Sequence, residues 1–75
     1  MMIDTTGRWP AVADAAASLD YDHLPPHLQA VSKPFHDLGA QLLEQLPDHR
    51  QLVFALDKLV EAKDCAVRVA VRTRQ

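Results

Sequence analysis

Cysteine, glycine and long apolar runs are scarce in this chain, and each scarcity excludes a class of protein. Cys65 is the one cysteine among 75 residues, which excludes an intrachain disulfide framework and a cysteine-based zinc site. Two glycines are too few for a glycine-rich phosphate loop. No apolar run approaches the roughly 20 residues of a membrane helix, and the start MMIDTTGRWP lacks the basic and apolar regions of a signal peptide. The sequence therefore predicts a cytoplasmic protein with no membrane partner.

The small size favours one domain that associates with further copies of itself. Apolar residues make up 48% of the chain, which is enough for a folded core rather than disorder. A single core in a chain of fewer than about 70–80 residues rarely supplies more than about 3–5 kcal/mol of stability. In the absence of a disulfide or a metal, we expect residues 1–75 to form a single helical domain that assembles into a homo-oligomer.

No constellation of residues in the sequence is typical of a catalytic site or a metal centre. The four histidines form no H-E-x-x-H pattern, and two prolines separate His23 from His27. Cys65 lies in an apolar segment without an adjacent base, and the serines lack the context of a catalytic triad. We therefore expect no enzymatic activity, no bound metal and no cofactor.

Charge is distributed unevenly along the chain. Residues 1–64 hold five basic residues against all ten acids, a net charge of −5, whereas the charged residues of segment 65–75 are Arg68, Arg72 and Arg74. The total of −2 and the lack of a broad basic stripe argue against a DNA or RNA polymer as partner. A small anion bound at the basic C-terminal end stays open as a ligand.

Proline positions and apolar spacing predict two helices in the first part of the chain. Pro10 suits the first position of a short alanine-rich helix over about 10–19, and Pro26 suits the start of a second helix over about 26–46. Pro34 predicts a kink or a break within the second helix, and Gly39 predicts a close approach by another helix. The apolar face of the second helix is expected to consist of Phe35, Leu38, Leu42, Leu43 and Leu46.

A third helix is predicted over about 49–72. Asp48 is suited to cap its start, with Gln51 three residues later. The stretch Cys65–Val71 is apolar on more than one side, and although its alternation also resembles a strand, the continuing helical period favours a helix. Because Pro47 leaves a turn of two or three residues, the second and third helices must pack antiparallel. The sequence thus predicts an all-α fold, a short N-terminal helix on a long hairpin, whose uncovered apolar side favours oligomerisation.

Residues 47–70 carry a pattern more specific than that of a generic amphipathic helix. A proline turn is followed by an arginine, by A-L-x-K-L-x-E-A and by a later small residue. These positions are Pro47, Arg50, Ala55, Leu56, Lys58, Leu59, Glu61, Ala62 and Ala66. Together with a Tyr-x-x-x-Pro-Pro segment before the second helix, the pattern resembles the hairpin domain shared by phage anti-CBASS cyclic-oligonucleotide sponges and Thoeris anti-defence sponges. The resemblance covers about residues 21–70.

The resemblance implies a function in evading host immunity. A sponge of this kind binds a cyclic di- or trinucleotide second messenger without cleaving it and hides it from the host's effector. The anti-CBASS members are helical hexamers, so the resemblance implies a homo-hexamer that pools side chains around each ligand. Two other functions stay open: a sponge for a cyclic ADP-ribose isomer, and a helical-hairpin module that binds proteins and no nucleotide.

The resemblance also places ligand-binding residues at the start of the second helix. Tyr21 matches a tyrosine that stacks on a base; its alternative role is packing on the hairpin. A basic residue of the second helix matches a phosphate ligand, and both Lys33 and His36 are candidates for it.

Three arginines complete the set of candidates. Arg68 and Arg72 are one turn apart near the end of the third helix, where the resemblance implies an arginine at the ligand. Arg68 alternatively pairs with an acid, either Asp64 on its own helix or an acid of another subunit. Arg50 is a candidate for a second pocket, and its alternative role is to bind carbonyl groups at the end of the second helix.

Overall fold

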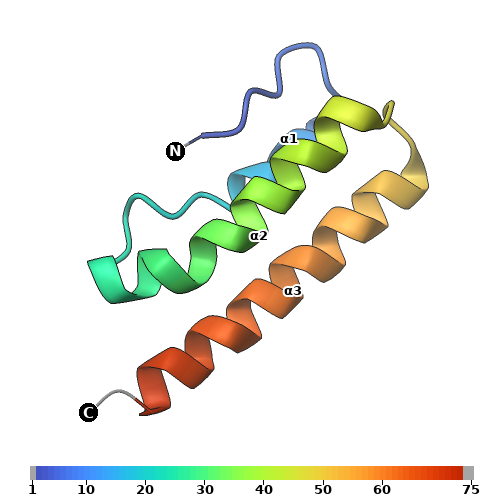
Figure 1. The fold of residues 1–75 in the computed structure, drawn as a ribbon. Helices are drawn as coiled ribbons and strands as arrows, with labels where there is room; N and C mark the ends of the chain where they lie inside the picture. Colours follow the sequence, from blue (N-terminus) through green and yellow to red (C-terminus); the bar gives the residue numbers. More distant parts are fainter. Residues whose placement is uncertain (1, 74–75) are drawn as a thin grey trace.

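Three helices make up the fold, as seen in a computed structural model that describes residues 2–73 (Figure 1). They are α1, Pro10–Ala17; α2, Pro26–Gln45; and α3, Arg50–Thr73. The described residues contain no strand, and the stretch 65–71 is helical throughout. The prediction of an all-α fold is therefore confirmed, whereas the strand alternative for this stretch is wrong. Arg74 lies outside the described residues.

Helix α1 begins at Pro10, as expected, and ends at Ala17, two residues earlier than expected. Its last turn tightens, because the amides of Ser18 and Leu19 donate to carbonyls three residues back. One side of α1 is buried against the hairpin, chiefly against α3. An isolated helix of eight residues would be marginal in water, so this packing is what stabilises it.

Helices α2 and α3 run antiparallel as the two arms of a hairpin (Figure 1). Pro34 lies inside α2 without breaking it, and the axis of α2 changes direction in its first half (Figure 1). A proline removes one backbone donor and crowds the carbonyl four residues earlier. The alternative of a kink is therefore the one that the structure shows, and the alternative of a break is wrong.

The buried face of α2 differs from the predicted one. Its buried residues are Leu28, Ser32, His36, Gly39 and Leu43. Of the expected apolar face, Leu38 and Leu46 are 45% and 42% exposed, so their predicted burial is wrong. The reason is tertiary: Ile3 and Leu19 pack around Gly39, so the N-terminal segment and α1 cover a side of α2 that the hairpin alone would leave open.

A single hydrophobic core joins all three helices. Gly39 lies at its tightest point, because a Cβ atom built there would be 2.5 Å from Leu19 Cδ1 and 3.5 Å from Leu59 Cδ2. The predicted close approach at Gly39 is therefore confirmed. The buried cluster consists of Val12, Ala15, Ala16, Leu19, Leu43, Leu52 and Leu56, with Ile3, Phe35, Val53, Leu59 and Val60 packed against it.

The start of α3 is capped by a different residue from the one predicted. The Nδ1 atom of His49 accepts a hydrogen bond from the Gln51 amide at 3.0 Å, and the His49 carbonyl accepts one from Val53. The Asp48 carboxylate instead binds Arg8 Nε at 2.8 Å and the Trp9 amide at 3.1 Å. The predicted cap by Asp48 is therefore wrong, because residues 39 and 40 positions upstream use that carboxylate.

Burial along α3 is confined to its first half. Leu52 and Leu56 are its buried residues, whereas Val69 and Val71 near its end are 61% and 57% exposed. One chain thus leaves the apolar end of α3 uncovered, as the pattern of Cys65–Val71 predicts. Among residues 2–73, no helix has the length and hydrophobicity needed to cross a membrane.

Candidate functional site

Tyr21 and His36 form a buried aromatic pair. Tyr21 lies in the segment between α1 and α2, and His36 lies near the middle of α2. Their ring centroids are 5.0 Å apart at an interplanar angle of 80°, which is the edge-to-face geometry that aromatic quadrupoles favour. Tyr21 is 8% exposed and His36 is 5% exposed. The segment before α2 therefore brings together two of the predicted ligand residues that are 15 positions apart.

Two buried polar atoms at or near this pair have no hydrogen-bond partner within residues 2–73. The Nδ1 atom of His36 lies 3.1 Å from Asp37 Oδ1, and because a carboxylate only accepts, a hydrogen bond between them requires the proton on Nδ1. The Nε2 atom of His36 and the hydroxyl of Ser32, one turn earlier, are both buried and have no hydrogen-bond partner among the described residues. An unpaired buried polar atom costs about 1–3 kcal/mol, so these two atoms mark a place where a hydrogen-bonding partner would be stabilised.

Lys33 is exposed on the same stretch of α2. Its Nζ atom lies 2.7 Å from Asp37 Oδ2, a pair one helical turn apart. The hydrogen bond with Asp37 raises the pKa of Lys33, and the hydrogen bonds from Lys33 and then His36 lower the pKa of Asp37. Both groups therefore stay charged, and a phosphate bound by Lys33 would have to compete with the Asp37 carboxylate.

Arg68 and Arg72 both project into solvent from the end of α3. Asp64, the acid one turn before Arg68, lies 2.9 Å from Lys63 Nζ. Arg68 has no ion pair among residues 2–73, so the predicted pairing with Asp64 on its own helix is wrong. Two guanidinium groups thus remain available to an anion or to an acid of another chain.

Arg50 lies at the opposite end of the hairpin, and the structural role considered for it belongs to Arg8. The guanidinium of Arg8 donates to the carbonyls of Leu43 at 3.1 Å and Leu46 at 2.8 Å, and to Asp48 at 2.8 Å. It thereby closes the C-terminal end of α2, while Arg50 is exposed. Sequence reasoning missed Arg8 because it stands in a segment without periodicity, and no local pattern points to a partner 35 to 40 positions away.

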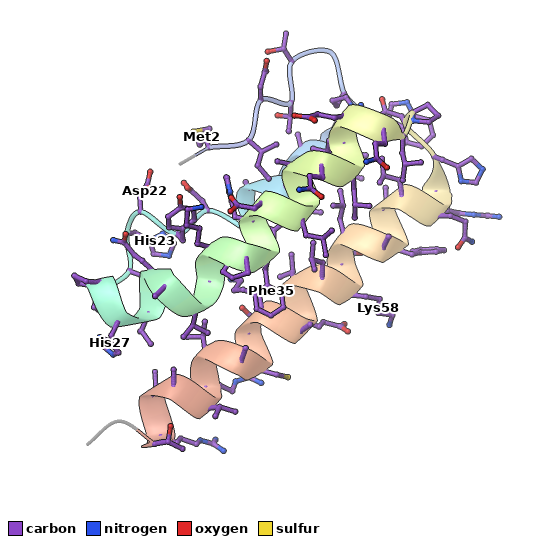
Figure 2. All side chains as sticks on the ribbon, in the orientation of Figure 1. Met2, Asp22, His23, His27, Phe35 and Lys58 are labelled. Atoms are coloured by element: carbon purple, nitrogen blue, oxygen red, sulfur yellow. The ribbon has the colours of Figure 1, made fainter. Side chains whose placement is uncertain are left out.

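The topology sorts the six candidates into two groups. Because α2 and α3 are antiparallel, the beginning of α2 and the end of α3 lie at the same end of the molecule (Figure 1). That end also holds Asp22, His23 and His27, around the start of α2 (Figure 2). Five candidates belong to this end: Tyr21 lies before α2, Lys33 and His36 lie no further along α2 than its middle, and Arg68 and Arg72 lie near the end of α3. Arg50 is remote from all of them.

The described residues hold no cluster of three or more His, Cys, Asp or Glu side chains that could bind a metal ion.

Comparison of the chain with protein-family models, curated proteins and solved structures finds no match. The class of protein defined by fold and site is thus a small helical hairpin with a buried Tyr–His pair and exposed cations at one end. The resemblance to the cyclic-oligonucleotide sponges, which rests on the motif residues alone, stays a prediction.

Proposed function

We propose that this protein binds a cyclic oligonucleotide second messenger and holds it intact, away from the immune effector of a bacterial host. The observation that carries the proposal is the buried Tyr21–His36 pair with the unpartnered atoms of His36 and Ser32 beside it. A tyrosine ring is a stacking surface for a base. The unpaired Nε2 and hydroxyl are buried, so they can form hydrogen bonds to the base only after the residues that cover them have moved. A base stacked on Tyr21 replaces part of the packing that now covers the ring.

Phosphate binding is assigned to the cations at the same end of the hairpin. Lys33 lies three positions before His36 on α2, and its charge is secured by Asp37. Arg72 and Arg68 add positive charge from the facing arm. Charged hydrogen bonds of this kind contribute about 1.5–3 kcal/mol each, which suits a ring of two or three phosphates.

Assembly into a homo-oligomer, a hexamer in the proposal, completes the site. One chain leaves the apolar end of α3 open to solvent, with Val69 and Val71 exposed. A chain of 75 residues encloses a nucleotide only by pooling side chains from several copies. The uncovered apolar end favours the same arrangement, because it is stabilised when another copy packs on it.

Calorimetric titration with a panel of cyclic di- and trinucleotides tests the proposal. Tyr21→Ala should weaken binding by about 1–3 kcal/mol per stacked base, or roughly tenfold to a hundredfold, while Tyr21→Phe should retain most of the affinity. Lys33→Ala should weaken binding, and Gln41→Ala, at an exposed position of α2 outside the candidate residues, is the control that should not. Circular dichroism of each variant separates a lost ligand contact from a lost fold.

Two results would overturn the proposal. Absence of binding to every nucleotide of the panel would favour a hairpin module that binds proteins, the function that the exposed Phe54, Val69 and Val71 otherwise support. Recovery of linear or hydrolysed nucleotide from the denatured complex would show an enzyme instead of a sponge. Binding of a cyclic ADP-ribose isomer alone would keep the sponge mechanism and change its ligand.

A further inference from the structure

The outward side of α3 carries a regular seam of exposed residues. Successive members are alternately four and three positions apart, which is the spacing of a coiled-coil interface. The seam residues are Gln51, Ala55, Lys58, Ala62, Cys65, Val69 and Arg72. All of them are exposed, and Lys58 projects from the side of α3 turned away from α2 (Figure 2). The hairpin therefore uses the opposite side of α3 for its own core and leaves this seam without a partner.

The two halves of the seam differ in shape. The N-terminal half borders a shallow depression that is open to solvent, lined by Gln51, Phe54, Ala55, Asp57, Lys58 and Glu61. The C-terminal half presents Val69, which is 61% exposed. The middle of the seam holds the small side chains of Ala62 and Cys65, which allow two helices to approach closely. A surface with a shallow depression at one end and a protruding apolar residue at the other is complementary to itself when one copy is inverted.

The charged residues along the edge of the seam also favour a second copy packed in the antiparallel direction. Glu61 and Arg68 are seven positions apart, so they lie on one side of α3 about two turns from each other. Both are exposed. Arg68 has no ion pair among residues 2–73, and Glu61 has only a 3.8 Å contact with Lys58, where both side chains are more than two-thirds exposed. In an antiparallel pair of helices, Glu61 of each copy would face Arg68 of the other.

We propose that α3 docks antiparallel on α3 of a second copy of this chain through the seam, with two symmetric Glu61–Arg68 ion pairs. The register places Ala62 opposite Cys65, Lys58 opposite Val69 and Ala55 opposite Arg72 of the second copy. Val69 of each copy then enters the depression beside Lys58 of the other. Sliding the copies by one heptad would set Glu61 against Glu61, so like-charge repulsion disfavours that register.

The interface requires no nucleotide and goes beyond the proposed ligand site. It supplies the acid of another chain that Arg68 lacks in its own, and it leaves Lys33, on α2, for phosphate. In this arrangement Arg68 and Arg72 belong to the interface and not to the ligand site. Sedimentation equilibrium of the ligand-free protein therefore tests the interface separately from the sponge function. A protein that binds nucleotide but stays monomeric would refute the interface alone. A protein that self-associates but binds no nucleotide would refute the sponge function alone.

Charge reversal at the proposed pair is the decisive experiment. Glu61→Arg and Arg68→Glu should each weaken self-association by about tenfold or more, because each sets like charges together twice per dimer. The double variant E61R/R68E should restore association, since it re-forms both pairs with the charges exchanged. Within one chain the two side chains are about two turns apart, so a change in monomer folding would not be reversed by the second substitution. Asp14→Arg, an exposed reversal on α1, is the matched control.

Crosslinking tests the register. Ala62→Cys introduces a thiol opposite the native Cys65 of the second copy, so mild oxidation should give a disulfide-linked dimer on a non-reducing gel. Ala13→Cys, on α1, should not give it at the same protein concentration. Failure of E61R/R68E to restore association, or absence of the crosslinked dimer in a variant that still associates, would refute the antiparallel α3 interface. A ligand-free monomer at tens of micromolar would refute it as well.

Discussion

Replacing Gly39 with alanine tests how tightly α1 is packed on the hairpin. The added Cβ would lie 2.5 Å from Leu19 Cδ1, where carbon atoms normally stay about 3.5–4.0 Å apart. Leu19 is completely buried, so its methyl group has no open space to enter. Overpacking of this kind costs about 1–3 kcal/mol, and alanine recovers about 1 kcal/mol of helix propensity. We expect Gly39→Ala to lower the free energy of unfolding by about 1 kcal/mol, or roughly 4–8 °C in Tm.

The effect of Gly39→Ala on stability should change from destabilising to stabilising once a second substitution makes space for the added methyl group. Leu19→Val removes the Cδ atoms at a cost of about 1 kcal/mol. In that background, Gly39→Ala meets no Cδ1 and should stabilise the protein by about 1 kcal/mol through helix propensity. Urea and thermal unfolding at one fixed protein concentration measure both effects, because an assembling protein has a concentration-dependent Tm. Equal stabilisation by Gly39→Ala in both backgrounds would refute the packing argument.

Two further predictions concern the electrostatics of the fold. Arg8→Ala should reduce the free energy of unfolding by about 2–3 kcal/mol, because it leaves the Asp48 carboxylate and the carbonyl end of α2 without their charged donor; urea unfolding measures it, and a loss no larger than that of exposed Arg50→Ala would contradict it. The pKa of Asp37 lies below its ordinary 3.8, chiefly through the hydrogen bond from Lys33. Its contribution to stability is therefore full above pH 3.8 and is lost as pH falls through the lowered pKa. Asp37→Asn should remove this part of the acid dependence of the urea midpoint, and an unchanged acid profile would contradict the assignment.

The residues of the candidate site come from the sequence motif, and their role in binding a ligand stays a prediction. The motif pointed to Tyr21, Lys33 and His36, and the fold brings these three together. Burial of the Tyr21 ring against His36 could not be predicted, since it depends on the path of the segment between α1 and α2. Separation of Arg50 from the other candidates follows from the antiparallel arrangement, which the short turn at Pro47 already implied.

The sequence by itself determined the helices and their pairing. Prolines at positions 10, 26 and 47 mark where helices begin or end because a proline lacks the backbone donor and has a fixed φ. The turn after Pro47 is too short for any arrangement except a hairpin. These effects act over a few residues, so they can be predicted from the sequence without knowledge of the tertiary structure.

Only the tertiary structure decided which faces are buried and which polar groups meet. The N-terminal segment packs on the side of α2 around Gly39, whereas Leu38 is exposed despite its apolar spacing. Arg8 takes the Asp48 carboxylate across 40 positions, which leaves His49 to cap α3. Which groups pair and which faces are buried depend on competition among residues that are distant in the sequence. The periodic pattern of a single segment does not identify these competing residues.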